Sequence, residues 1–472
     1  MVATEPTSRR GVPLNLLPWM VAGLGALTLS ACGGERAAGP RPYLDAAIET
    51  ADWLDGVGRE HDDLRWWPDW VEQPDQVNPS LGSGVGGPIV FYLALANATG
   101  DDRYRETAVA GGRYLLDTLP QLLAAAADAR SPGGLYGGLP SVALTLDAVF
   151  HATGDSTFRH AAVGTLEHLH QLVRVVDDGV EWAPYNDVLF GSAGTGLFLI
   201  HAGREWGHPP SLDLARQVGE TLLIRAEPAE VGLTWRLRQD REIYLPNFSH
   251  GPAGIGFFLA TLSQVFDDPR YLAAAIAAGD YLVSIARTDD GGFILPYSVP
   301  NGEFNASWDV GWAHGPAGSA RLFYALWRIT GNDRWWDVVA RSVVALQNSG
   351  LPGAAAAEFE TDRFRIDQRF GLAGVAMFLL DLYQATNDGA YHAFGREVVD
   401  SILTQSTIDS TGRRWTIPQY GFMPAEGEPA SFTGYFYGAA GFGLALLRAD
   451  GASQGIRWEE SLPDNPWGHG SP

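Results

Sequence analysis

The sequence predicts an all-α protein, an α/α toroid (double-layered barrel) of seven helical hairpins with GxxG-type turns. Three observations lead to this fold class: a glycine-rich turn recurs seven times, an apolar helix follows each copy, and an amphipathic helix follows most of the apolar ones. A motif that repeats about every 60 residues is typical of folds in which each unit buries its apolar face against the next. Seven such pairs close most economically into a ring of two layers.

The repeated turn consists of an apolar or aromatic residue, a glycine and several small residues. Its seven copies are Gly84-Val85-Gly86-Gly87, Gly137-Gly138-Leu139-Pro140, Gly191-Ser192-Ala193-Gly194, Gly251-Pro252-Ala253-Gly254, Gly315-Pro316-Ala317-Gly318, Gly371-Leu372-Ala373-Gly374 and Gly438-Ala439-Ala440-Gly441. The first copy also satisfies the dinucleotide-binding pattern G-x-G-x-x-G from Gly82. We reject a dinucleotide site, because no clean strand precedes this stretch and the same turn recurs six more times.

The helices that follow the turns are apolar on most faces, as in Ile255–Val265, and are expected to form the buried inner layer. Each ends in a turn such as Thr153-Gly154-Asp155, which predicts a chain reversal and a cap for the next helix. The second helices, such as Arg270–Ala286, are amphipathic and are expected outside. All seven turns then face one end of the ring, where helix N-termini converge and a ligand is expected.

The first residues predict export and a lipid anchor. Arg9 and Arg10 precede an apolar stretch, and the single cysteine follows Leu29-Ser30-Ala31 in the form of a lipobox. We expect residues 1–31 to be a lipoprotein signal peptide, 32–42 a tether with a lipidated Cys32, 43–450 the barrel and 451–472 a flexible tail. The protein is then exported and lipid-anchored to the bacterial cell membrane, facing the periplasm or exterior, and its partner at that surface is the membrane. The twin arginines leave Sec or Tat export open.

The composition excludes several classes of function. A net charge of −23 argues against nucleic-acid binding. The chain contains no lysine, which excludes Schiff-base chemistry and phosphate-loop lysines. If Cys32 is lipidated, no thiol remains for disulfides, thiolate catalysis or metal binding. The sequence therefore predicts no cofactor and no metal.

The residues that precede the first glycine of each turn are expected to line the mouth of the ring. They are Ser83, Tyr136, Phe190, His250, His314, Phe370 and Tyr437. For the aromatic members, a collar that packs the helix starts is the favoured interpretation, and they are also candidates for ligand contact. His250 and His314 occupy matching places in adjacent hairpins, and each could be catalytic or a hydrogen-bonded core residue.

Polar side chains precede several turns at a constant spacing. Asp187, Asn247 and Asp367 stand four residues before the first glycine, and Asp309 stands two residues further back in the fifth hairpin. Carboxylates and imidazoles that converge on one pocket are the groups that general acid–base chemistry needs. The alternative is that these side chains cap the glycine turns.

These hairpins resemble the lanthionine synthetase C-like (LanC-like) family over essentially the whole chain after the tether. The resemblance is sharpest in Tyr185–Gly194, Ser249–Gly254 and Trp312–Gly318. It implies that Asp187 and His250 fall where the family's cyclases carry acid–base residues. It also implies a zinc site, held in those cyclases by two cysteines and a histidine, which activates a peptide thiol for addition to a dehydrated serine or threonine.

The zinc motifs are absent from this sequence. The family's Trp-Cys-Tyr-Gly is Trp312-Ala313-His314-Gly315 here, and its Cys-His-Gly is Arg369-Phe370-Gly371. Alanine, arginine and phenylalanine side chains do not bind zinc. A rebuilt metal site of His250 and His314 with Asp309 or Asp367 is a further alternative.

Three functions remain open at this stage. The favoured one is an envelope-tethered LanC-like protein that binds or modifies a peptide or small polar ligand in the barrel mouth, without the family's zinc-dependent thioether chemistry. The second is a carbohydrate-active α/α-barrel enzyme of the glycoside hydrolase or lyase type, with a saccharide ligand and a catalytic pair among Asp187, Asp309 and Asp367. The third is a non-catalytic scaffold. Besides the collar residues, Asn247, Trp312 and Arg369 are candidates for ligand contact.

Overall fold

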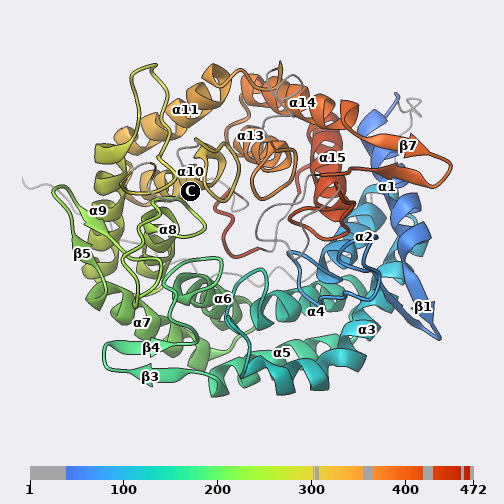
Figure 1. Cartoon of the computed structure of the whole chain (residues 1–472), viewed down its shortest axis with the longest axis horizontal. Coiled ribbons are helices and arrows are strands. Elements are labelled where there is room, and N and C mark those ends of the chain that lie inside the picture. Colours follow the sequence, from blue (N-terminus) through green and yellow to red (C-terminus); the bar gives the residue numbers. More distant parts are fainter. Residues whose placement is uncertain are drawn as a thin grey trace, which may run out of the picture. The chain divides into compact units, whose positions relative to one another are not determined.

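A computed structural model of the chain describes residues 39–300, 302, 308–353, 365–417, 429–458 and 462–467. Residues 41–472 form one compact unit, and the expected signal peptide with Cys32 lies outside the described residues. None of the helices described is long and apolar enough to cross a membrane. The predicted all-α toroid is confirmed, with helices in two concentric layers (Figure 1).

The inner layer consists of the helices that start at the glycine turns. They are α2 (Gly86–Thr99), α4 (Leu139–Thr153), α6 (Ser192–Glu205), α8 (Pro252–Ser263), α10 (Pro316–Thr330), α13 (Leu372–Thr386) and α15 (Ala439–Gln454). Ten of the twelve residues of α8 are buried, as expected for a helix that is apolar on all sides.

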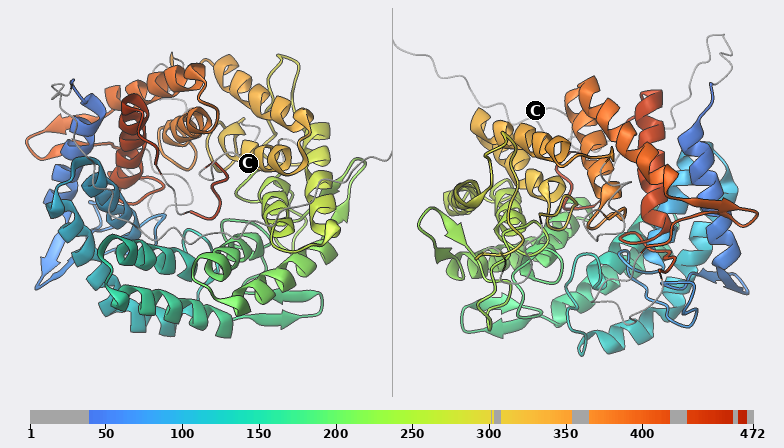
Figure 2. Two further views of the ribbon diagram at one scale, coloured as in Figure 1. Left: turned by 180° about the vertical axis from the view of Figure 1, so that it is seen from behind. Right: turned by 45° about the horizontal axis from the view of Figure 1, so that its top comes forward.

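The outer layer consists of the amphipathic helices. They are α1 (Pro42–Val57), α3 (Asp102–Ala126), α5 (Ser156–Gln171), α7 (Pro209–Ile224), α9 (Pro269–Ile285), α11 (Asp333–Asn348) and α14 (Gly389–Thr404). Six of them follow their inner partner in sequence. The seventh, α1, packs against α15, so the two ends of the barrel sequence close the ring (Figures 1 and 2).

The turns between inner and outer helices have the expected caps. Three of the inner helices that lead into an outer helix end at a left-handed glycine, Gly100, Gly154 or Gly331, with φ between 64° and 72°. Side chains at the start of the next helix then accept the backbone N–H two residues on, at 2.9 Å in the case of Asp155. This geometry reverses the chain within a few residues and keeps each hairpin antiparallel.

Short antiparallel hairpins lie at the periphery, after the outer helices (Figure 1). They pair β1 (Arg59–His61) with β2 (Leu64–Trp66), β3 (Arg174–Val176) with β4 (Gly179–Glu181), β5 (Glu227–Pro228) with β6 (Leu233–Thr234), and β7 (Thr407–Asp409) with β8 (Gly412–Arg414). A buried tryptophan follows each hairpin and donates its indole N–H to the carbonyl thirteen residues earlier, at the end of the preceding outer helix. These residues are Trp67, Trp182, Trp235 and Trp415.

The glycine turns bring backbone into direct contact with backbone. A Cβ built on Gly251 would lie 1.6 Å from the carbonyl oxygen of Leu245, and one on Gly318 would lie 1.8 Å from that of Trp312. Only glycine fits at such a distance. The loop before each inner helix can therefore fold tightly over the helix start, which places its side chains at one end of the ring.

Residues 451–458 and 462–467, the described part of the expected flexible tail over residues 451–472, are ordered differently from that expectation. Helix α15 continues to Gln454, and residues 462–467 run inside the ring (Figure 1). Trp467 packs against Tyr324 with ring centroids 4.0 Å apart, and Asp464 is fully buried. A polar, proline-containing composition suggested a loose tail, but burial of Trp467 and a set of hydrogen bonds to Asp464 hold this segment in place.

Candidate functional site

Five of the seven residues that precede the first glycines form a continuous row of rings at the starts of the inner helices. Phe190 stacks on His250 at 5.6 Å, His250 meets His314 edge-on at 5.4 Å, and His314 lies 5.6 Å from Phe370. Tyr437 continues the row at 6.3 Å from Phe370. We call these five residues the collar. It places two imidazoles from adjacent hairpins side by side in an aromatic setting.

Tyr136 does not belong to the collar, which corrects the expected alignment of the second repeat. Helix α4 is preceded by Gly138, whereas α6, α8, α10, α13 and α15 are preceded by the first glycine of the motif. The second repeat is therefore shifted by one residue, and Gly137 takes the collar position. Because Gly137 and Gly138 are both glycines, the sequence alone allowed either alignment. Tyr136 instead lies beneath the collar, 5.1 Å from Trp312.

The polar residues four positions before the glycines cap the turns, as the structural alternative predicted. One oxygen of each side chain accepts the backbone N–H three residues on: Asp187 from Phe190 at 3.0 Å, Asn247 from His250 at 2.9 Å, and Asp367 from Phe370 at 2.8 Å. Both carboxylates and the amide are fully buried. This role alone accounts for one oxygen of each group.

The second oxygen of Asp187 makes a further contact that distinguishes it. Oδ2 lies 2.6 Å from Nδ1 of His250, and the His250 side chain is 9% exposed. A carboxylate only accepts hydrogen bonds, so Nδ1 donates and the lone pair of the neutral ring is on Nε2. An imidazole held in one tautomer by a buried carboxylate is the arrangement that a general base requires.

His314 differs from His250 in its surroundings. Its Nδ1 lies 3.4 Å from Nδ2 of Asn247 and 4.0 Å from Oδ2 of Asp309, and the ring packs 4.3 Å from that of Tyr297. Burial lowers the pKa of His314 well below its usual value, and the nearby His250, Arg369 and Arg365 lower it further. His314 is therefore a neutral imidazole that packs against His250.

The carboxylates do not present a matched pair of exposed groups. Asp187 and Asp367 are fully buried and cap turns, whereas the side chain of Asp309 is 22% exposed. A glycoside hydrolase needs two carboxyl groups on either side of the bond that it cleaves. The structure gives Asp309 access to solvent but gives no comparable access to Asp187 or Asp367.

The positions of the family's zinc ligands do not fit a metal. Ala313 is fully buried and offers only a methyl group. The Arg369 guanidinium lies 4.7 Å from the Phe370 ring and donates to the hydroxyl of Tyr437 at 2.5 Å. Burial raises the pKa of Tyr437 to about 12, so this hydroxyl keeps its proton. A cation and two apolar groups stand where the family has three ligands, and none of them can bind zinc. Across the described residues, no three histidine, cysteine, aspartate or glutamate side chains are grouped as metal ligands.

Beneath the collar, Asp464 from the C-terminal segment ties several elements together. Its carboxylate accepts hydrogen bonds from the hydroxyl of Tyr136 at 2.8 Å, from Nε1 of Trp312 at 3.1 Å and from Nη1 of Arg321 at 3.2 Å. Tyr136 and Trp312 were expected to contact a ligand at the mouth. Both are 2% exposed and direct their polar atoms to Asp464 instead. They form the floor under the collar.

Sequence reasoning missed a cationic cluster beside the collar. Arg130 and Arg238 come from loops between hairpins and both donate to the hydroxyl of Tyr185. The Arg130 guanidinium also lies 5.6 Å from the Phe190 ring. No repeat or motif marks these arginines, because the loops that carry them differ between hairpins.

The fold and the collar together define a toroid of seven hairpins with an Asp–His pair at the starts of the inner helices. A family model described as lanthionine synthetase C-like protein matches residues 75–458. The chain belongs to this family. A search of curated proteins gives no match.

Among solved structures, nisin cyclase is similar to this chain with a TM-score of 0.59 and 14% identity, over 89% of this chain and 96% of the cyclase. A D-mannose isomerase matches with a TM-score of 0.44 and 16% identity, over 66% and 88% of the two chains. An α-1,6-mannanase of Salegentibacter matches with a TM-score of 0.44 and 11% identity, over 87% and 99%. At these identities the likeness concerns the fold alone.

Proposed function

We propose that this chain is an envelope-tethered LanC-like protein that binds or modifies a peptide or small polar ligand at the collar, without zinc-dependent thioether chemistry. The observation that supports this most directly is the hydrogen bond of 2.6 Å between buried Asp187 and His250. It preserves a proton-accepting imidazole in a chain whose sequence lacks the family's zinc ligands.

In this proposal His250 accepts a proton through Nε2, and Asp187 keeps the ring oriented and stabilises the imidazolium that forms. Nδ1 is occupied by Asp187, so Nε2 is the ring nitrogen that can face a ligand. His314 stays neutral and closes one side of the site. The pair can serve proton transfer to or from a bound ligand.

Ligand screening on the full-length chain in detergent tests this function. We expect defined peptides to raise the melting temperature, neutral oligosaccharides to leave it unchanged, and any modification to appear as a mass change of the peptide. His250→Phe should abolish the mass change and retain binding, because phenylalanine occupies the same collar position in the third and sixth hairpins. A melting temperature that rises with saccharides and not with peptides would contradict the proposal and favour the carbohydrate-active alternative.

Metal analysis of the same samples provides an independent arm. We expect no stoichiometric metal in the metal-exchanged wild-type chain. Stoichiometric metal that is lost in both His250→Ala and His314→Ala would overturn the proposal and indicate a rebuilt metal site. Metal that both variants retain would point to a site elsewhere and leave the Asp187–His250 pair in the proposed role.

The proposed location depends on Cys32, which follows Leu29-Ser30-Ala31. Cleavage before this cysteine and attachment of a diacylglyceryl group would leave residue 32 as the first residue of a membrane-anchored protein. We expect radiolabelled fatty acid to be incorporated into the wild-type chain and not into Cys32→Ala. Equal labelling of both chains would contradict the anchor and leave the proposed ligand function untouched.

A further inference from the structure

The loop cluster beside the collar brings two guanidinium groups onto one phenol. Arg130 donates to the Tyr185 hydroxyl from Nε at 2.9 Å and from Nη2 at 2.7 Å, and Arg238 donates from Nη1 at 3.1 Å. A phenol oxygen accepts about two hydrogen bonds and has one hydrogen of its own to donate. Three N–H donors therefore exceed what this oxygen can accept. An anion bound beside the cluster would supply further acceptors for these N–H groups.

The two arginines differ in how their charge is balanced. Arg238 forms a bidentate pair with Asp240, with hydrogen bonds of 2.8 and 2.7 Å. Arg130 forms no ion pair with any residue in the part of the chain that the structure describes, and its residue is exposed. In a chain with a net charge of −23, Arg130 therefore leaves a local positive charge beside the collar.

The cluster is held in place by contacts among three loops. The Ser131 hydroxyl donates to the carbonyl oxygen of Phe190, which fixes the Arg130 loop to the collar. The backbone N–H of Gln239 donates to the carbonyl oxygen of Pro184 at 3.1 Å, which fixes Arg238 beside Tyr185. These contacts hold both arginine side chains beside the collar.

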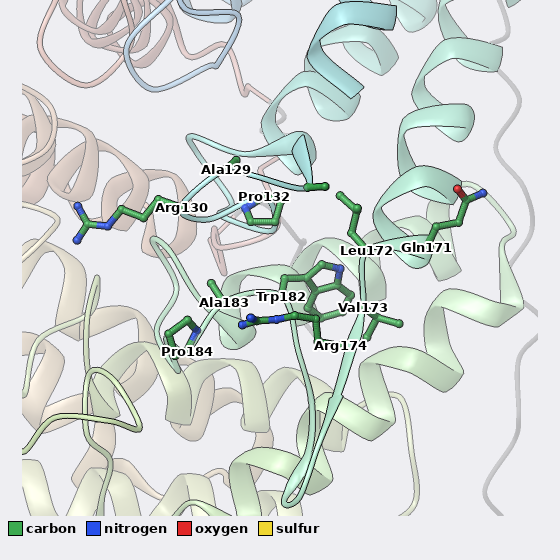
Figure 3. Close-up of a pocket in the computed structure, with 11 residues that line it drawn as sticks. Ala129, Arg130, Pro132, Gln171, Leu172, Val173, Arg174, Trp182, Ala183 and Pro184 are labelled. Carbon is green, nitrogen blue, oxygen red and sulfur yellow. The ribbon is translucent and has the colours of Figure 1, made fainter. Parts of the chain in front are cut away.

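A pocket of about 380 Å³ has Arg130 among its eleven lining residues (Figure 3). Eight of its eleven lining residues have apolar side chains, among them Pro132, Leu172, Val173 and Trp182. These apolar side chains suit an apolar group of a ligand, and Arg130, Gln171 and Arg174 add polar groups to the lining. Arg130 thus lines this pocket and also contacts the Phe190 ring of the collar.

We propose that Arg130, Tyr185 and this pocket form a subsite for a peptide ligand, in which Arg130 binds a carboxylate and the pocket takes the neighbouring apolar side chain. This rests on the proposed function, since it assigns a ligand class to the same collar. The Phe190 ring lies 5.6 Å from the Arg130 guanidinium and 5.6 Å from the His250 ring. Those spacings put the carboxylate and His250 within the reach of about three extended residues.

Titration calorimetry on the full-length chain tests the subsite with acetyl-Gly-Gly-Leu as the free acid and as the C-terminal amide. A hydrogen-bonded charge makes the acid bind at least about tenfold more tightly than the amide. Arg130→Gln should remove this preference. Arg216→Gln is the matched control, because it removes the same charge from outer helix α7, where the Arg216 side chain is 56% exposed. This variant should keep the preference for the acid.

Two further arms separate the alternatives. D-glucuronate carries a carboxylate without an apolar side chain and should bind at least about tenfold more weakly than the peptide acid; equal or tighter binding would overturn the peptide assignment. The His250→Phe variant should keep the preference for the acid. No binding of the peptide acid, or a preference that survives Arg130→Gln, overturns the subsite and leaves the function of the Asp187–His250 pair to its own test.

Discussion

Replacing Asp187 by asparagine separates its two roles. The asparagine carbonyl can still accept the backbone N–H of Phe190, as Asn247 does for His250 at 2.9 Å in the next turn. The amide nitrogen, however, replaces the oxygen that now lies 2.6 Å from Nδ1 of His250. A donor would then face a donor, so we expect His250 to move its hydrogen to Nε2 and to lose its free lone pair at the site.

The energetic size of this contact follows from its burial and charge. A buried hydrogen bond to a charged group contributes about 1.5–3 kcal/mol. In a double-mutant cycle of Asp187→Asn and His250→Phe, we expect a coupling free energy of about 2 kcal/mol. Asp187→Ala also removes the cap of the turn and should lower the free energy of unfolding by about 1 kcal/mol more than Asp187→Asn.

Urea unfolding of the four chains of the cycle measures the coupling, and nitrogen chemical shifts of the His250 ring report its tautomer. A second cycle of Asp187→Asn with His314→Phe is the control, because His314 bonds to neither oxygen of Asp187, and its coupling should stay below about 0.5 kcal/mol. A coupling below about 0.5 kcal/mol in the first cycle would refute the role of Asp187. So would an unchanged tautomer in Asp187→Asn.

Three further predictions concern the scaffold around the collar. Gly251→Ala would place a Cβ 1.6 Å from a carbonyl oxygen, so we expect thermal unfolding to show a free energy of unfolding about 3 kcal/mol lower. In the control Gly137→Ala, nothing lies within 4 Å of the added carbon, and the free energy of unfolding should change by less than about 0.5 kcal/mol. Burial lowers the pKa of His314, so the unfolded chain binds the extra proton as pH falls. Stability should therefore decrease below about pH 6.5 by up to about 1.4 kcal/mol per unit relative to His314→Phe, and parallel pH profiles would contradict this. Asp464→Ala removes a carboxylate from the buried guanidinium of Arg321 and should lower the free energy of unfolding in urea by about 3 kcal/mol. A decrease below about 1 kcal/mol would show that Asp464 does not stabilise the residues beneath the collar.

The fold was predictable from the sequence because the same turn and helix pattern repeats along the chain. Seven glycine turns, each followed by an apolar helix, determine which helices are buried and which end of the ring collects the turns. Two features of the fold were not predicted, because they depend on contacts between residues far apart in the sequence. Helix α1 closes the ring against α15, and Asp464 reaches Tyr136 across more than three hundred residues. Neither contact leaves a local pattern of hydrophobicity or turn residues.

The candidate site was predictable in part. The spacing of Asp187, Asn247 and Asp367 before the glycines allowed either acid–base groups or turn caps, and the structure shows all three as caps. It did not show that Asp187 reaches His250 in the next hairpin, since this depends on how adjacent hairpins pack. Arg130 was missed for a related reason, because a single arginine in a variable loop is not distinguishable from a solvated surface charge.

The replacement of the zinc ligands changes which chemistry the collar can support. A zinc ion bonds directly to a thiol and removes its proton, whereas a guanidinium such as that of Arg369 offers charge and hydrogen bonds without an open coordination position. In the proposed function, the collar therefore activates no thiol. An oriented imidazole remains, 5.4 Å from a neutral second one, with a positive charge beyond the Phe190 ring. Those groups are suited to moving a proton on a bound anionic ligand, and for this reason we expect the sequence of the ligand around its carboxylate, rather than a thiol, to determine what the protein recognises.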